Sequence, residues 1–237
     1  MKKKVGNKIK AENANWSFSG KTAENFDNHI NKSIPLYLWT HEIGLQLSDF
    51  FLTNETIAYD VGCSTGSFLK KLSVRVKNKK VKLIGLDEIP EMILKAKKNC
   101  KKFNNIKLIK TDINKIKLKK NNLTTSFFTM SFIKPAKRQL IFNKIFKSLN
   151  WGGGFLFFDK VRAPDARFQD MMSQIYNEFK ISQGFTSDEI LSKSSSLKGV
   201  LEPFSSNANI LLAKRAGFKD VMTIFKFLNF EGFLAIK

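Results

Sequence analysis

The stretch YDVGCSTGSFL, residues 59–69, decides the fold. Residues 59–61 end an apolar run typical of a buried strand, Gly62 and Gly66 enclose a short polar segment, and an apolar pattern with helical spacing follows. A strand that passes through a glycine turn into a helix leaves backbone uncovered, so that a ligand can approach it closely. The stretch therefore predicts a binding site at the end of a sheet.

Strand-like and helix-like runs alternate around this stretch, from residue 56 to residue 158. The strand-like runs are 56–62, 81–87, 106–112, 122–130 and 155–161, and the helix-like runs are 66–76, 90–103 and 135–149. Pro90 and Pro135 suit first helical turns, and Gly152, Gly153 and Gly154 are expected to stop the third helix. The alternation predicts an α/β three-layer sandwich with a mostly parallel sheet, whose ligands bind beyond the carboxyl ends of the strands.

The flanking segments extend this core. Residues 1–55 are predicted to form a mobile basic tail and a helical lid over 22–52, and residues 56–237 a ligand-binding unit, all within one structural domain. After the core, helices are predicted over 165–182, after a capping box of Thr186 and Glu189, and over 206–217. Residues 218–237 are predicted to form two antiparallel strands.

The composition restricts the class of protein. The chain has 237 residues, 43% hydrophobic residues and a formal charge of +21, and it has neither an apolar run long enough to span a bilayer nor a signal-peptide pattern, so a cytoplasmic location is expected. Its two cysteines show no zinc or disulfide spacing.

The formal charge of +21 suggests RNA binding as one alternative. Only five of the 41 basic residues are Arg, which favours solvated lysine faces over an RNA-binding stripe.

The glycine segment restricts the ligand. Ser67 and Phe68 follow Gly66 where a phosphate-binding P-loop needs Lys and Ser or Thr, and serines replace two glycines of the dinucleotide fingerprint. What remains is Asp60-x-Gly62-x-x-x-Gly66, with the acids Asp87 and Asp112 ending the next two strands. Acids at strand ends without a phosphate cradle suit a nucleoside that lacks phosphates, S-adenosylmethionine (SAM). In this interpretation Asp60 orients the loop or the amino acid part of SAM.

The chain also resembles a known family over residues 15–237, the carboxy-S-adenosylmethionine synthases. The segments that carry the resemblance are NWSF (15–18), SIPLY (33–37), YDVGCSTG (59–66), LDEIPEMI (86–93), TDI (111–113), KPAKRQ (134–139), LNWGGG (149–154), GFTSDEI (184–190), LLAKRAGF (211–218) and FLNFEGFLAIK (227–237). The resemblance implies a class I methyltransferase fold, a homodimer and SAM as ligand. It also implies transfer of a carboxyl group from prephenate to the SAM methyl group, which gives carboxy-SAM and phenylpyruvate, for modification of the wobble uridine of transfer RNA.

The resemblance further implies roles for individual residues. It assigns closure over the ligand to Tyr37, backbone contacts with the amino acid part to Gly62, Cys63 and Ser64, the ribose side to Asp87 and Glu88, and the adenine to Asp112 and Ile113.

Two positions depart from the family pattern. Phe127 stands where the family has an Asn that touches the ligand, and Ser194 stands where an Arg pairs with the added carboxylate. A buried carboxylate without a cation is costly, and Ser offers one neutral hydrogen bond. Lys160, Arg162 or Lys193 is the candidate to supply the missing charge.

Three functions stay open at this point. A SAM-dependent transferase related to the family, with an unassigned methyl acceptor, ranks ahead of a true carboxy-SAM synthase, and a non-catalytic SAM- or RNA-binding protein is the third. No catalytic base is assigned, because methyl transfer from a sulfonium depends mainly on positioning. His29 and His41 are interpreted as packing or surface residues and Cys63 as a packing thiol, whereas Trp16 and Phe18 are candidates to cover the pocket.

Overall fold

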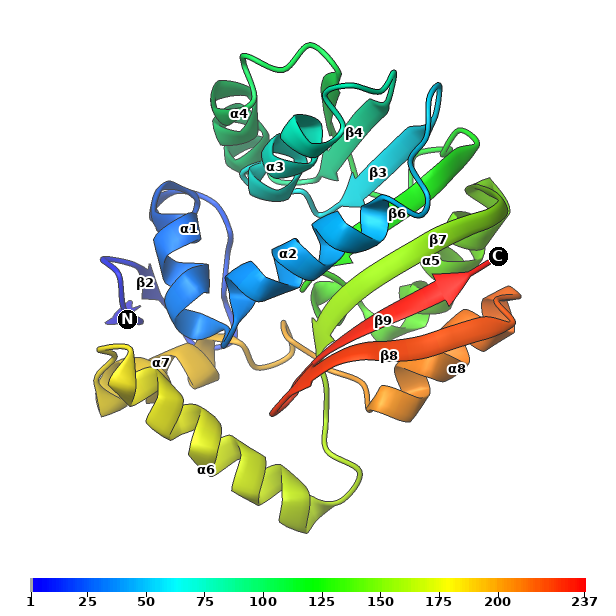
Figure 1. Ribbon diagram of the computed structural model, residues 1–237. Coiled ribbons are helices and arrows are strands. Elements are labelled where there is room, and N and C mark those ends of the chain that lie inside the picture. Colours follow the sequence, from blue (N-terminus) through cyan, green and yellow to red (C-terminus); the bar gives the residue numbers. More distant parts are fainter. Residues whose placement is uncertain (1) are drawn as a thin grey trace.

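The computed structural model describes residues 2–237, and its centre is a seven-stranded sheet in the order β5-β4-β3-β6-β7-β9-β8 (Figure 1). The strands are β3 (Ile57–Val61), β4 (Lys82–Asp87), β5 (Ile106–Lys110), β6 (Asn121–Phe127), β7 (Leu149–Lys160), β8 (Asp220–Phe227) and β9 (Phe230–Ile236). Strands β3 to β7 pair in parallel, whereas β9 pairs antiparallel with β7 and β8. The predicted α/β sandwich with its antiparallel pair at the end of the chain is confirmed.

Eight α-helices within residues 2–237 lie on the two faces of the sheet or beyond its carboxyl edge (Figure 1). They are α1 (Lys21–Ser33), α2 (Tyr37–Ser48), α3 (Ser67–Arg75), α4 (Pro90–Asn99), α5 (Pro135–Ser148), α6 (Ala166–Ser182), α7 (Ser187–Ser196) and α8 (Ser206–Ala216). Helices α2 and α3 cover one face of the sheet, and α5 and α8 cover the other (Figure 1). Helices α1, α6 and α7 lie beyond the carboxyl ends of the parallel strands, where the sequence predicts the binding site (Figure 1).

Alternating side chains of β7 build both cores. Phe155 and Phe157 pack with residues of α5 and α8, whereas Leu156 and Phe158 pack with residues of α2 and α3. All four are fully buried. Because successive side chains of a strand point to opposite faces, one apolar run fills both layers, and each buried side chain contributes roughly 2 to 3 kcal/mol.

The two glycines of the deciding stretch are needed for different reasons. Gly62 has φ 75° and Gly66 has φ 74°, backbone angles that favour glycine. A Cβ at Gly62 would collide with the side chain of Thr129, and a Cβ at Gly66 would lie 2.8 Å from the sulfur of Cys100. Gly62 therefore shapes the loop, and Gly66 lets α3 begin tightly against α4.

The helices after the core begin where the sequence predicts. The Asp165 side chain accepts a hydrogen bond from the Phe168 amide at 3.1 Å and caps α6. The Thr186 hydroxyl accepts from the Glu189 amide at 3.2 Å, and the Glu189 carboxylate accepts from the Thr186 amide at 3.1 Å. The predicted capping box of α7 is thus confirmed.

Three segments differ from the expectation. The amino-terminal segment forms a small antiparallel hairpin, β1 (Lys3–Lys4) and β2 (Lys10–Ala11), where a mobile tail is predicted. Val5 and Ile9 are each 1% exposed and pack with Trp16, so apolar burial orders this lysine-rich segment. The predicted lid is two helices, because the chain breaks at Leu36 with φ 56°. Strand β7 already starts at Leu149, so the three glycines lie in a strand.

Candidate active site at the carboxyl edge of the sheet

A cavity of about 1270 Å³ lies at the carboxyl ends of the parallel strands. Each of the five parallel strands contributes the residue at its end or just after it to the lining of this cavity. In the chain order β3 to β7, these residues are Gly62, Asp87, Asp112, Phe127 and Lys160. Residues of α1, α6 and α7 cover it from the other side. A ligand pocket for one small molecule typically measures 300 to 1,000 Å³, so this cavity has room for a nucleoside and a second small molecule.

The glycine loop is tied to the end of β4. The amides of Gly62 and Cys63 donate to the Leu86 carbonyl at 2.8 and 3.0 Å, and the Ser64 amide donates to Asp87 Oδ2 at 2.9 Å. The Gly62 carbonyl receives only a long bond from the Ser64 hydroxyl, at 3.4 Å. Because the amides are engaged within the protein, the group that this loop offers to a ligand is the carbonyl of Gly62, an acceptor suited to an ammonium group.

Two of the predicted loop residues face away from the cavity. Cys63 lines only a small secondary cavity behind the loop, and its side chain is 5% exposed within the core of α2 and α3. Burial raises the pKa of its thiol well above the ordinary value, so the thiol stays protonated and serves packing. Gly66 lies at the start of α3 and lines neither cavity.

Asp87 and Glu88 lie side by side at the tip of β4. The Asp87 carboxylate accepts from the amides of Ile89 and Ser64, both at 2.9 Å, one on each oxygen. A carboxylate has about four acceptor positions, so each oxygen keeps one for a hydroxyl group of a ligand. Burial raises the pKa of Asp87, and these amides oppose the shift. Glu88 is exposed at the rim of the same cavity.

Asp112 and Ile113 follow β5, the neighbouring strand. The Asn114 amide and side-chain nitrogen both donate to Asp112 Oδ1 at 2.8 Å, which fixes the carboxylate and lowers its pKa. Ile113 is 8% exposed and lines the cavity beside it. We call Gly62, Ser64, Asp87, Glu88 and Asp112 together the acidic end of the cavity.

Asp60 and Tyr37 line the secondary cavity of about 20 Å³, which adjoins the main cavity because the two share lining residues such as Gly62, Ser64 and Phe127. Asp60 is 2% exposed and accepts a hydrogen bond from the Thr125 hydroxyl at 2.8 Å. Burial raises the pKa of Asp60 to about 7. The Tyr37 ring contacts the rings of His41 and Phe128, with centroids 4.6 and 5.8 Å away. The geometry therefore places Asp60 where it supports the loop.

Phe127 is part of the wall of the main cavity. Its ring stacks on Phe158 at 5.2 Å and meets the edge of His41 at 4.7 Å. It is 9% exposed and takes the place of the amide side chain that the resemblance implies. At this point the cavity wall is apolar.

Three half-buried lysines line the opposite part of the cavity: Lys160 at the end of β7, Lys180 in the last turn of α6 and Lys193 in α7. Arg162 and Ser194 line it as well. Burial, followed by the charges of Lys180 and Arg162, lowers the pKa of Lys160 to about 8. Burial also lowers the pKa of Lys180 to about 8, and burial and the Lys180 charge place the pKa of Lys193 well below its usual value. We call Lys160, Arg162, Lys180 and Lys193 the cationic end.

Lys180 is a residue that sequence reasoning missed. Its helix has an ordinary amphipathic pattern, and a lysine near a helix end usually interacts with solvent or the last carbonyls. A weak signal was present, because Tyr176 and Lys180 are four residues apart and so lie on the same face of α6.

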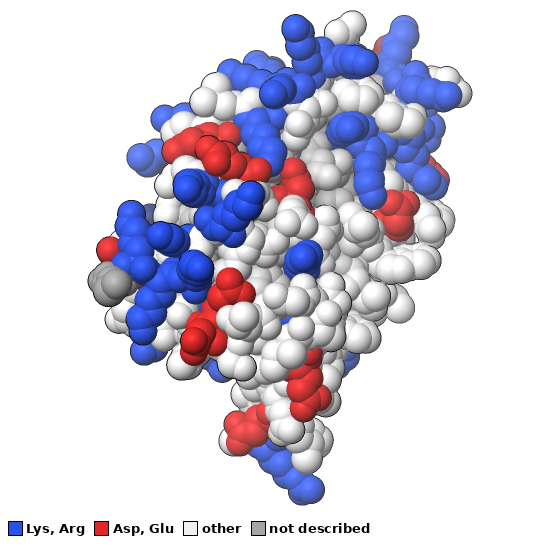
Figure 2. Space-filling view, turned by 90° about the vertical axis from the view of Figure 1, so that its left-hand side faces the viewer, with Lys and Arg blue, Asp and Glu red and all other residues white. Residues whose placement is uncertain are grey.

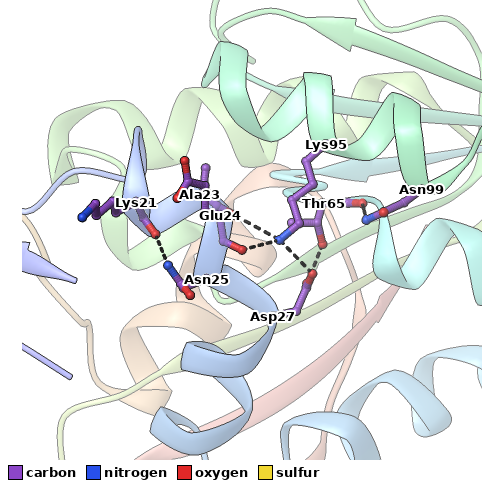
Figure 3. A network of polar contacts seen from close by, with 8 residues as sticks. All are labelled: Lys21, Ala23, Glu24, Asn25, Asp27, Thr65, Lys95 and Asn99. Atoms are coloured by element: carbon purple, nitrogen blue, oxygen red, sulfur yellow. Dashed lines mark hydrogen bonds and ion pairs between the residues drawn. The ribbon is translucent and has the colours of Figure 1, made fainter. Parts of the chain in front are cut away.

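Helix α1 is fastened over the acidic end by polar contacts (Figure 3). Asp27 Oδ1 accepts from the Thr65 hydroxyl at 2.6 Å, and Asp27 Oδ2 lies 3.4 Å from the ammonium of Lys95. Lys95 also donates to the carbonyls of Ala23 and Glu24, at 3.1 and 2.9 Å, and Asn99 donates to the Thr65 carbonyl at 2.9 Å. The lid, the glycine loop and α4 are therefore joined through one carboxylate.

Comparisons with known proteins agree with this geometry. Residues 52–227 match the model of a family described as a methyltransferase domain. A carboxy-S-adenosyl-L-methionine synthase of Staphylococcus epidermidis is 36% identical over 94% of this chain and 97% of its own length. A protein of the same name from Sulfurimonas denitrificans is 35% identical over 96% of this chain and 97% of its own length.

The chain belongs to the carboxy-S-adenosyl-L-methionine synthase family. As a member it is a SAM-dependent transferase with a class I methyltransferase fold, as the resemblance implied. The crystal structure of a SAM-dependent methyltransferase from Aquifex aeolicus shares the fold at a TM-score of 0.59 and 18% identity, over 90% of this chain and 97% of that one. Within residues 2–237, no helix is both long and apolar enough to cross a membrane.

The acidic end fits SAM as this family would bind it. Its acids have free acceptor positions for ribose hydroxyls and a base, and the Gly62 carbonyl can accept from the ammonium of the methionine part. SAM when bound supplies an electrophilic methyl group on a sulfonium. The residues that would hold it are Gly62, Ser64, Asp87, Glu88 and Asp112. The contacts predicted for Tyr37, Asp60 and Cys63 would come from the adjoining secondary cavity, which these three residues line.

Proposed function

We propose that this protein makes carboxy-SAM from SAM and prephenate. The observation that carries the proposal is that one cavity is lined by Asp87, Glu88 and Asp112 beside β4 and β5 and by Lys160, Lys180 and Lys193 of β7, α6 and α7, lysines that form no ion pair within residues 2–237. Asp159, Glu189 and Glu202 also line the cavity. SAM carries positive charge on its sulfonium and ammonium groups, whereas prephenate carries two carboxylates. A cavity with opposite charges at its two ends is suited to hold the two molecules together.

The reaction constrains what the site has to do. One carboxyl group of prephenate becomes attached to the SAM methyl carbon, and that methyl group loses a proton. The ring hydroxyl of prephenate leaves with this proton as water, and phenylpyruvate is released. The protein has to hold the methyl group beside the acid and exclude bulk water, which the cover of α1, α6 and α7 supports.

In this proposal the cationic end also compensates for the arginine that the resemblance implies at position 194. Ser194 is exposed at the cavity and offers no charge, but Lys193 precedes it, and Lys160 and Lys180 enter from β7 and α6. A lysine lacks the planar fork of arginine, so we expect several ammonium groups to replace one guanidinium. We infer that these lysines stabilise the carboxylate that the reaction adds to SAM.

The direct test is turnover. We expect purified protein incubated with SAM and prephenate to release phenylpyruvate, detected by its ultraviolet absorbance, and to form a SAM derivative that is heavier by one carboxyl group. Reactions without SAM should release none beyond the spontaneous rate. Release of phenylpyruvate that does not depend on SAM, or no release, would reject the proposal.

A methyltransferase with another acceptor is the second candidate. The departures at Phe127 and Ser194 favour it, because both remove polar groups that the family resemblance places at the ligand. In that case the same incubation with an extract of small molecules should give S-adenosylhomocysteine. The homodimer, the cytoplasmic location and the use of the product in transfer RNA modification belong to the same proposal as expectations from the family.

A further inference from the structure

The lysines of the cationic end have no acidic partner. Within residues 2–237, the ion pairs involve other lysines and an arginine, namely Lys71, Arg75, Lys95 and Lys226. Cations that are withdrawn from water without a counter-ion are costly, and a folded protein keeps them when a ligand supplies the charge. Three such lysines around one cavity therefore indicate an anionic ligand with more than one charge.

Aromatic rings divide these lysines into two groups. Lys160 and Lys180 both point at the ring of Tyr176, with their nitrogens 4.6 and 4.4 Å from its centroid. The Tyr176 hydroxyl donates to the Ser33 carbonyl at 2.8 Å, which fixes the ring between α6 and the end of α1. The π system of this ring attracts both ammonium groups and holds each of them beside Tyr176 in the cavity wall.

Lys193 forms the second group with the amino-terminal segment. Its ammonium lies over the ring of Trp16, and the Trp16 ring stacks on His29 with centroids 5.7 Å apart. Trp16 is 7% and His29 is 5% exposed, and both line the cavity. The indole nitrogen and both imidazole nitrogens have no hydrogen-bond partner within the described chain. Buried N–H groups without an acceptor are uncommon and unfavourable.

The unpaired groups are of one chemical type. The indole nitrogen and the ammonium are hydrogen-bond donors only, and a neutral imidazole offers one further donor. The ligand group that satisfies them has to bring acceptors and negative charge, as a carboxylate does. Lys160, Lys180 and Lys193 line the same cavity as Trp16 and His29, so one ligand can reach both groups.

We propose that the cationic end is a site for a dicarboxylic acid, in which Lys160 and Lys180 hold one carboxylate and Trp16, His29 and Lys193 hold the other. This proposal rests on the proposed function and names the residues that select its acid substrate. It gives the amino-terminal segment a direct part in binding that acid. It also replaces the packing role that the sequence suggested for His29.

The test uses a complex that cannot react. S-adenosylhomocysteine lacks the methyl group, so prephenate and its product phenylpyruvate can be titrated calorimetrically into protein saturated with it. Prephenate has two carboxylates and phenylpyruvate retains one. The variants are Lys180→Met and Lys193→Met, with His29→Leu as a second probe of the Lys193 group and Lys214→Met, an exposed position on α8, as the control.

We expect Lys180→Met and Lys193→Met each to weaken the binding of prephenate about tenfold or more, because each removes a partner of one of its two carboxylates. Only one of the two variants should weaken the binding of phenylpyruvate to a similar extent, because phenylpyruvate has a single carboxylate. His29→Leu should weaken the binding of the same acids as Lys193→Met, but by a smaller factor. Lys214→Met should change neither affinity, and all variants should bind S-adenosylhomocysteine like the wild type, which verifies their folding.

The site is rejected if the wild type binds neither acid, if neither lysine variant weakens prephenate, or if both weaken the two acids equally. The outcome is separable from that of the proposed function. Turnover of prephenate with unaffected variants would leave the function standing and reject the dicarboxylate site. Weakened prephenate binding in the variants without carboxy-SAM formation would support the site and reject the function.

Discussion

Asp87 shows how single residues build this site. Its carboxylate holds the Ser64 amide of the glycine loop and the Ile89 amide before α4, and it still faces the cavity. The same side chain therefore shapes the loop and remains available to a ligand. An acid at the end of the second strand was predicted from the sequence, but its bond to the loop was not, because that bond depends on the register of β3 and β4.

Ser194 lines the cavity where the resemblance implies an arginine. We expect Ser194→Arg to raise the affinity for carboxy-SAM about tenfold and to change that for SAM less than twofold, because a guanidinium forms a bidentate pair with a carboxylate. Isothermal titration with both ligands measures this. Ser194→Lys is the matched control and should gain less. Equal gains for the two ligands would show that position 194 does not face the added carboxylate.

Asp60 gives a prediction for pH. Its folded pKa of about 7 lies above the ordinary value of 3.8, so the fold favours the protonated form. The stability that Asp60 contributes is complete below about pH 4 and is lost as the pH rises through about 7. Asp60→Asn stays neutral and can still accept from Thr125. Its free energy of unfolding relative to the wild type should therefore increase by about 4 kcal/mol between about pH 4 and about pH 8.

Urea denaturation at several pH values measures this difference. Asp159 is buried as well and has its pKa raised to about 6, so the wild-type curve alone combines several groups. The difference between variant and wild type isolates Asp60. A difference that stays constant over the pH range would show that the folded protein does not raise the pKa of Asp60.

At the scale of elements, the lid and the sheet have different kinds of support. Helix α1 is joined to the glycine loop by Asp27 and Lys95 (Figure 3), whereas β7 is held by alternating aromatic side chains in both cores. The polar contacts between α1 and the loop are partly exposed, although Ala23 and Phe26 of α1 also pack against Met92 of α4, whereas the contacts of β7 are apolar and buried. We therefore expect changes in the lid to affect binding and changes in β7 to affect stability.

Asp27→Ala tests the lid. The substitution removes the acceptor of the Thr65 hydroxyl and the partner of Lys95, so α1 should close less firmly over the loop. We expect the dissociation constant of SAM to rise about three- to tenfold, in keeping with the loss of one charged hydrogen bond at a partly exposed position. Glu24→Ala removes the same charge from the same helix without touching Thr65 and should leave SAM binding unchanged. Similar effects of both variants would indicate that only the net charge matters.

Phe157→Ala tests the sheet. The Phe157 ring is fully buried and contacts the rings of Phe142, Phe155 and Phe233, with centroids 4.8 to 5.2 Å apart. We expect a loss of about 3 to 5 kcal/mol in the free energy of unfolding, measured by chemical denaturation, because the truncation leaves a cavity. Leu140→Ala on α5, where the side chain is 63% exposed, should cost less than about 0.5 kcal/mol. A loss at Phe157 no larger than that at Leu140 would contradict the described core.

Much of the element pattern follows from the sequence because it depends on local signals. Pro90, Pro135 and the Thr186 capping box mark helix starts that the structure confirms. The ordered amino-terminal hairpin was missed, because its order depends on contacts of Val5 and Ile9 with a segment almost 190 residues later that includes Leu197. The cationic end was missed in part for the same reason, since its lysines come from three separate elements.

At the scale of the whole molecule, the charge of +21 is spread unevenly. On the face shown in Figure 2, lysines and arginines gather mostly toward the upper and left edges, and acidic groups and a broad uncharged area lie between them and the lower end. Two of the five arginines serve the fold: Arg75 pairs with Asp49 at 2.6 Å, and Arg138 is 1% exposed and donates to backbone carbonyls. On the face shown in Figure 2, this distribution favours separate solvated lysine groups over a continuous nucleic-acid surface.

The opposite charges at the two ends of the cavity are the feature on which the functional account depends. Asp87 at the end of β4 and Asp112 just after β5 line the same cavity as lysines from β7, α6 and α7. Such an arrangement places a cationic nucleoside beside an anionic acid. The chemistry then takes place at the methyl group between them.

Mass spectrometry of the reaction with SAM that is fully deuterated at its methyl group tests this claim most directly. With prephenate present, we predict a nucleoside product that has gained a carboxyl group and retains two of the three deuterons, because one is lost when the new carbon–carbon bond forms. Unlabelled S-adenosylhomocysteine as the product, with all three deuterons on another molecule, would contradict the account and identify the protein as a methyltransferase.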